Sequence, residues 1–148
     1  MTMEMRLREA EEIGFFDIEL PSTDATPVRL SNLGAKVVML YFWSATAEQK
    51  MFNIDALVPL YEEFHGRGFE IYAVSLDADK TAWATTVRAQ RLPWINVCDI
   101  RGAQSPYVGM YGVSSVPMAW MIVDGTIDAS AHVTDAASIR KYLQIKLK

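Results

Sequence analysis

Residues 37–42 form a continuous apolar run, which constrains the fold of this chain more than any other segment. A strand that is apolar on both faces is typical of a parallel sheet that helices cover on either side. A second run of this kind occupies residues 69–76. The segment between the two runs has apolar residues at helical spacing and a capping residue, Thr46, at its start. We therefore predict a βαβ unit in which the stretch from Tyr41 to Lys50 closes the first strand and opens the helix.

The rest of the chain alternates between strand and helix patterns, in the order β-β-β-α-β-α-β-α-β-β-α. Further strands are predicted at 15–20, 28–30, 94–98, 118–123 and 126–132, and further helices at 77–91, 103–111 and 135–147. We expect an α/β fold with a central mixed sheet flanked by helices, an N-terminal β-hairpin and an inserted helix and strand. Residues 14–148 are predicted to form a single domain, preceded by a polar leader at 1–13.

Composition and charge disfavour several classes of function. The chain has 148 residues, of which 51% are hydrophobic and 22% charged, and its net charge is −4. It has no basic run, so nucleic-acid binding is not expected. No apolar run approaches the roughly 18 residues of a membrane span, and the charged N-terminus lacks the apolar core of a signal peptide. The sequence leaves two origins open: a cytosolic protein, or the mature segment of a longer exported precursor.

Five segments carry a resemblance to a known family. They are, in chain order, VRLSNLGAKVV at 28–38, YFWS at 41–44, YAVSLD at 72–77, YGVSSVP at 111–117 and IVDGTI at 122–127. With these segments in this order and spacing, the chain resembles the TlpA/ResA-like branch of the thioredoxin superfamily, which borders on the peroxiredoxins. The resemblance covers nearly the whole chain. It implies a thioredoxin-like fold and a relationship to thiol-disulfide oxidoreductases.

Both redox cysteines of that family are absent. The family's Trp-Cys-x-x-Cys motif falls on five residues that we call the degenerate motif: Thr46, Ala47, Glu48, Gln49 and Lys50. Ala47 and Lys50 replace the two cysteines. Dithiol exchange needs a thiolate of low pKa and a second thiol that releases the mixed disulfide, and peroxide reduction needs the first of these cysteines. We therefore expect the usual redox site to be inactive.

Other side chains near the motif could carry chemistry, and each also has a structural interpretation. Lys50, in the first turn of a helix, could have a lowered pKa and act as a covalent nucleophile, or it could be a solvated lysine. Ser44, Thr46 and Ser115 could form a cluster of nucleophilic hydroxyls, or they could cap helices and bond loops. Neither histidine of the chain lies in a motif with these hydroxyls.

Cys98 and two aspartates follow predicted strands. Cys98 is the only cysteine, so the chain cannot form an intrachain disulfide. It could be a lone reactive thiol of an atypical oxidoreductase that uses an external thiol, or a small buried apolar residue. Asp77 and Asp99 both end parallel strands and could hold a metal, but no third ligand lies at a useful spacing. We expect loop and capping roles for them, with no metal site and no cofactor.

The resemblance implies that a binding surface remains. Val116 and Pro117 match the family's cis-proline position, where an extended substrate peptide pairs with the backbone before the proline. We expect Trp43, at the surface, together with Ser115, Val116 and Pro117, to line this groove, or Pro117 to have a structural role alone. The predicted function is a redox-inactive module that binds a peptide or protein or serves a structural role. Relatives of this type point to the periplasm or cell envelope.

Overall fold

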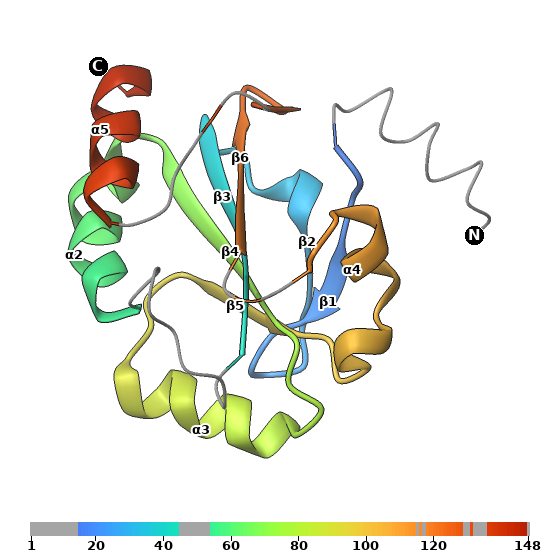
Figure 1. Ribbon diagram of the computed structural model, residues 1–148. Coiled ribbons are helices and arrows are strands. Elements are labelled where there is room, and N and C mark those ends of the chain that lie inside the picture. The colour runs from blue at the N-terminus through green and yellow to red at the C-terminus, as the bar shows by residue number, and fades with distance from the viewer. Residues whose placement is uncertain are drawn as a thin grey trace.

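A five-stranded mixed sheet forms the centre of the computed structural model, which describes residues 15–44, 54–114, 116, 118–128, 131 and 136–147 (Figure 1). Its strands are β3 (Val37–Trp43), β4 (Phe69–Ser75), β5 (Ile95–Cys98), β6 (Met118–Val123) and β7 (Thr126–Ile127), in the order β5-β4-β3-β6-β7. The strands β3, β4 and β5 run parallel, whereas β6 runs antiparallel to both β3 and β7. The predicted mixed sheet is confirmed.

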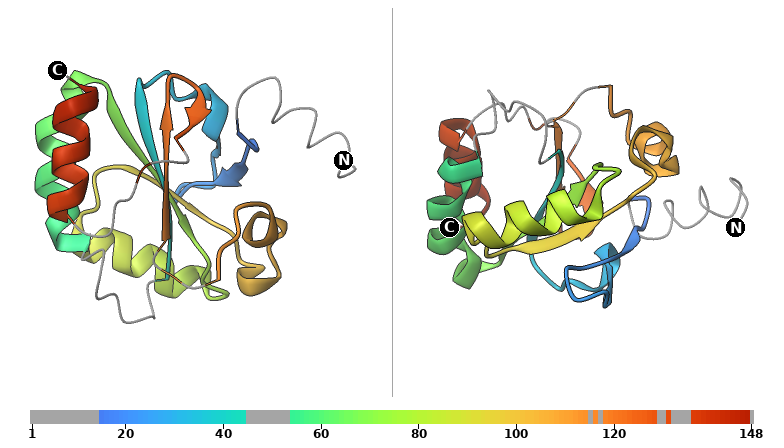
Figure 2. Two further views of the ribbon diagram at one scale, coloured as in Figure 1. Left: turned by 45° about the horizontal axis from the view of Figure 1, so that its top comes forward. Right: turned by 90° about the horizontal axis from the view of Figure 1, so that it is seen from below.

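Both faces of the sheet are buried. Successive side chains of β3 point to opposite sides of the sheet, and those on each side are covered. On one face lie α2 (Ile54–Phe64), α3 (Lys80–Gln90) and α5 (Ala136–Lys146), which enclose one apolar cluster with the sheet. On the other face lie α4 (Pro106–Met110) and a separate hairpin of β1 (Glu19–Pro21) and β2 (Pro27–Arg29), which enclose a second cluster (Figures 1 and 2). Three single-turn 3₁₀ helices complete the fold: η1 (Leu30–Asn32), η2 (His65–Arg67) and η3 (Gly102–Gln104).

The N-terminal hairpin is attached to the sheet by polar contacts as well as by packing. The Tyr72 hydroxyl, on β4, donates a hydrogen bond of 2.8 Å to the carbonyl of Val28. The Tyr111 hydroxyl donates to the carbonyl of Phe16. An isolated bridge joins Ser22 to Val97 of the edge strand β5. The hairpin therefore lies against the edge of the sheet that β5 forms.

Two strands are shorter than the sequence predicts by three residues or more. The first was expected over 15–20 but begins at Glu19, because the Asp17 carboxylate accepts the backbone N–H of Ile18 at 2.9 Å and of Ser31 at 3.0 Å. A side chain thus takes bonds that a strand partner would otherwise make. The last strand was expected over 126–132 but ends at Ile127, and the N–H of Ala131 turns back to the Asp128 carbonyl.

Capping sets the helix boundaries. The helix predicted at 77–91 begins at Lys80, because the Asp79 carboxylate accepts two backbone N–H groups of its first turn at 2.9 and 3.1 Å. The helix predicted at 103–111 is divided into η3 and α4. Ser105 separates them, and its hydroxyl accepts the N–H of Tyr107 as the N-cap of α4. Pro106 occupies the first turn of α4, as expected.

None of the helices in the described ranges is both long enough and apolar enough to cross a membrane. The polar leader at 1–13 and the predicted cap at Thr46 lie outside the described residues, so the domain boundary at residue 14 stays a prediction.

Candidate functional site

The expected site lies where β3 ends, and the structure describes part of it. Trp43 is the last residue of β3, and Ser44 follows it. The whole degenerate motif (Thr46, Ala47, Glu48, Gln49 and Lys50) lies outside the described residues, as do Ser115 and Pro117. The inactive motif and the cis form of the proline bond therefore stay sequence predictions.

The backbone nevertheless brings Ser44 and Val116 together. Strand β6 pairs antiparallel with β3, with Met118 opposite Phe42. Ser44 lies two residues after Phe42, and Val116 lies two residues before Met118. Both residues line one hollow of about 240 Å³, whose wall consists of Ser44, Leu76, Ala103, Val108, Val113, Ser114 and Val116. The hollow is largely apolar, and it lies between the end of the central strand and the α4 region.

Trp43 does not behave as the sequence predicted. We expected its side chain at the surface of the groove, but only 1% of Trp43 is exposed. The indole packs in the cluster under α2, α3 and α5, and its N–H has no hydrogen-bond partner in the part of the chain that the structure describes. The reason is strand alternation: Trp43 shares a face with Tyr41 and Met39, and that face is fully covered.

Ser44 belongs to a hydrogen-bonded cluster centred on Asp77. The Ser44 hydroxyl donates to one carboxylate oxygen of Asp77 at 2.6 Å, and the Ser75 hydroxyl donates to the other at 2.5 Å. The backbone N–H of Asp77 in turn donates to the Ser75 hydroxyl at 3.1 Å. Asp77 is only 4% exposed and Ser75 is fully buried. The Ser44 hydroxyl proton is thus committed to a buried carboxylate, which favours a structural role over a nucleophilic one.

The second aspartate is neutralised by its own partner. Asp99 is 3% exposed, and its two oxygens accept hydrogen bonds of 2.8 Å each from the Arg101 guanidinium. Burial opposes ionisation of Asp99, but hydrogen bonds from Arg101 and Ser105 outweigh it and hold the pKa of the carboxyl below its usual value. Among the described residues no group of three or more metal-ligating side chains occurs.

Cys98 is buried, directly precedes Asp99 in the chain and contacts the backbone of Asp77. It is 3% exposed, and its thiol donates a weak hydrogen bond of 3.5 Å to the backbone carbonyl of Asp77. Burial raises the pKa of the thiol, as do the charges of Asp77 and Asp99, while a hydrogen bond with Ser75 and the charge of Lys80 act in the opposite direction. A buried thiol with a raised pKa is a poor nucleophile.

His65 lies apart from the hydroxyls. Its ring stacks on Tyr61 at 4.6 Å between centroids, and its Nε2 lies 3.4 Å from the Glu70 carboxylate. The structure therefore joins no described histidine to Ser44. The second histidine, His132, and the hydroxyls of Thr46 and Ser115 lie outside the described residues.

A sequence model of the AhpC/TSA family matches residues 14–130. The chain belongs to the AhpC/TSA family. A comparison with curated protein sequences gives no match.

Several solved structures that are described as thiol-disulfide oxidoreductases or thioredoxin-like proteins share this fold, which confirms the thioredoxin-like fold. A thiol-disulfide oxidoreductase from Bacteroides fragilis aligns with a TM-score of 0.75 at 23% identity, over 87% of this chain and 96% of that one. The thioredoxin domain of a thiol-disulfide oxidoreductase from Bacteroides vulgatus aligns with a TM-score of 0.76 at 20% identity, over 89% and 94%. An uncharacterized thioredoxin-like protein from Bacteroides vulgatus is 29% identical, with a TM-score of 0.70 over 88% and 86%.

The hydrogen-bonded cluster centred on Asp77 in this AhpC/TSA domain was not predicted from the sequence. The pairing of Ser44 with Asp77 joins residues 33 positions apart, and no local pattern shows it. The bond from the Asp77 backbone N–H to the Ser75 hydroxyl was readable, because a serine side chain commonly bonds the backbone two residues further on. The apolar lining from Ala103, Val108 and Val113 depends on how α4 docks on the sheet.

Proposed function

We propose that this AhpC/TSA domain has lost thiol-disulfide exchange and binds an extended segment of a peptide or protein beside the start of β6. The observation that carries the proposal is a combination of two facts. Ala47 and Lys50 stand where the resemblance places the redox cysteines, while Ser44 and Val116 still border one apolar hollow. The chemistry depends on thiols that the chain lacks, whereas binding depends on backbone and shape that it retains.

The hollow suits one apolar side chain of such a segment. Val116 precedes β6 and is half-buried, and its backbone groups are those that pair with the substrate peptide in the family. A segment that adds to this backbone as a strand directs alternate side chains to one side. One of these would enter the hollow of about 240 Å³ between Val113 and Leu76. Backbone pairing would supply affinity, and the hollow would supply selectivity for apolar side chains.

An atypical oxidoreductase that uses Cys98 is the alternative, and the surroundings of Cys98 weigh against it. An attacking thiol must be exposed and partly ionised. Cys98 is 3% exposed, and burial raises its pKa. No observation in the described part of the chain favours this second function.

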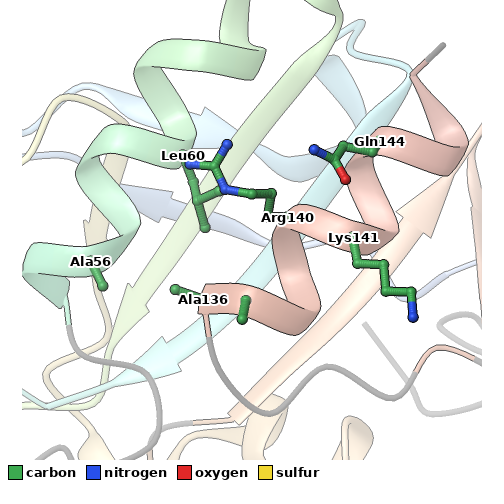
Figure 3. Close-up of a pocket in the computed structure, with 7 residues that line it drawn as sticks. Ala56, Leu60, Ala136, Arg140, Lys141 and Gln144 are labelled. Carbon is green, nitrogen blue, oxygen red and sulfur yellow. The ribbon is translucent and has the colours of Figure 1, made fainter.

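Selection of peptides tests the binding function. A display library of random linear peptides would be selected on the full chain, and the enriched peptides would be assayed against two tryptophan variants. Ala103→Trp fills the proposed hollow from an exposed position. Ala137→Trp is the matched control, because Ala137 is also exposed but lines a separate hollow between α2 and α5 (Figure 3). We expect Ala103→Trp and Val116→Pro to abolish binding and Ala137→Trp to preserve it.

Two results would contradict the proposal. One is the absence of any enriched peptide, and the other is equal binding by Ala103→Trp and the original chain.

We also propose a location in the periplasm or cell envelope, which the family resemblance supports. Fractionation of the source cells with an antibody against the full-length protein tests this, and a purely cytosolic signal would contradict it.

A further inference from the structure

A second hollow lies between the N-terminal hairpin and the residues that follow β5, and it is separate from the proposed peptide groove. Its volume is about 390 Å³, within the range of roughly 300–1,000 Å³ that small-molecule sites occupy. The residues that line it are Leu20, Pro21, Lys80, Cys98, Asp99, Ile100 and Arg101. None of the residues that line the peptide groove contributes to it.

One side of this hollow is apolar. Leu20 and Pro21 come from β1, and Cys98 contributes a buried thiol that cannot readily ionise. Ile100 completes this side and is 59% exposed. In the described part of the chain only one other large apolar side chain, Ile145, is as exposed as Ile100. An apolar ligand body that covered Ile100 would remove this surface from water, which favours binding.

The other side of the hollow is cationic. The only carboxylate in the lining, Asp99, is already bonded through both oxygens to Arg101. The Lys80 side chain makes no hydrogen bond or ion pair with the residues that the structure describes. Lys80 is itself one of the residues that line the hollow. The lining therefore carries one net positive charge, in a chain whose net charge is −4.

The position of Lys80 conflicts with the local preferences of a helix. It is the first residue of α3, an eleven-residue helix. The helix dipole disfavours a cation at that end. The Asp79 carboxylate, which caps the same turn, places one negative charge there. An anionic ligand group beside Lys80 would add a second.

We propose that this hollow binds a small amphipathic carboxylate. The ligand carboxylate lies beside Lys80 and the outer face of the Arg101 guanidinium, and an unbranched or cyclic apolar body lies against Leu20, Pro21 and Ile100. The hollow between α2 and α5 is a poorer candidate for the same ligand (Figure 3). There, Arg140 is paired with Glu63, and the Lys141 side chain points away from α2.

Titration of the full chain with three ligands of equal chain length tests this site. The probes are octanoate, 1-octanol and octylammonium at pH 7, and the readout is the methyl resonances of Leu20 and Ile100. We expect saturable shifts with octanoate, and affinities for the neutral and cationic probes that are at least about tenfold lower, because only the anion is attracted by Lys80.

Two variants locate the charge. Lys80→Gln is expected to weaken octanoate binding about five- to tenfold. Lys141→Gln, an exposed lysine at the other hollow, is expected to leave it unchanged. An unchanged methyl spectrum in the absence of ligand confirms that each variant is folded. The proposal is overturned by the absence of saturable shifts, by equal affinity for all three probes, or by equal affinity of Lys80→Gln and the original chain. These outcomes are independent of the peptide groove.

Discussion

Ser44 donates a hydrogen bond of 2.6 Å to the carboxylate of Asp77, and this contact fastens the end of β3 to the end of β4. Asp77 is buried, so its oxygens depend on protein donors in place of water. Ser75 supplies the other donor. The strand end that borders the peptide groove is therefore held by a polar cluster beneath it.

Removing the Ser44 hydroxyl should destabilise the fold. In Ser44→Ala the buried carboxylate of Asp77 loses a donor, which costs about 1–3 kcal/mol of unfolding free energy. Urea denaturation followed by circular dichroism measures this. Ser114→Ala is the control, because Ser114 is exposed in the same hollow, and it should change stability by less than about 0.5 kcal/mol. Equal stability of Ser44→Ala and the original chain would show that the cluster contributes nothing.

The pair of Asp99 and Arg101 should make stability depend on pH. The folded-state pKa of Asp99 lies below its value in the unfolded chain, so this carboxylate contributes stability above about pH 4, the usual pKa of an aspartate. That contribution is lost as the pH falls through the folded-state pKa. Arg101→Gln should therefore destabilise the protein by about 1–2 kcal/mol at pH 7, and the deficit should shrink as the pH falls towards 3.

The control for this pair is Arg88→Gln, which removes an exposed arginine on α3. Its effect on the unfolding free energy should be small at every pH. A deficit of Arg101→Gln that is the same at pH 7 and pH 3 would mean that Asp99 does not sense Arg101.

Cys98 should react slowly in the native state. Burial raises the pKa of its thiol and blocks access, so alkylation by iodoacetamide at pH 8 should be at least about tenfold slower in the folded protein than in urea. Mass spectrometry follows the reaction at a single site, since the chain has one cysteine. Similar rates in the two states would indicate an accessible thiol and would revive the single-cysteine alternative.

Hydrophobic patterning was sufficient to predict the sheet and its helices. The runs at 37–42 and 69–76 became neighbouring parallel strands, because segments that are apolar on both faces are stable only between two layers. The boundaries at Glu19 and Ile127 were missed. They depend on individual hydrogen bonds, such as those that the Asp17 carboxylate accepts, and these bonds compete with strand pairing.

The candidate site was less readable. Ser44 was recognised as a polar residue at the strand end, but Asp77 was expected to have only a loop or capping role, and its pairing with Ser44 was not predicted. Asp77 and Asp99 each have their own hydrogen-bond donors. Long-range pairings of this kind follow from how two strand ends align, which no local pattern encodes. The burial of Trp43 was missed for a similar reason. The sequence places Trp43 at the end of the strand, but it does not show that the helices cover the sheet as far as this residue.

The most direct test of the central claim is an insulin-reduction assay with dithiothreitol, in which an active thioredoxin is the positive control. The account predicts that the full chain reduces insulin no faster than buffer does, because Ala47 and Lys50 stand at the positions of both exchange cysteines. The Cys98→Ser variant should give the same baseline. Turnover above the buffer rate by the original chain, abolished in Cys98→Ser, would contradict the account and identify an oxidoreductase that works with one thiol.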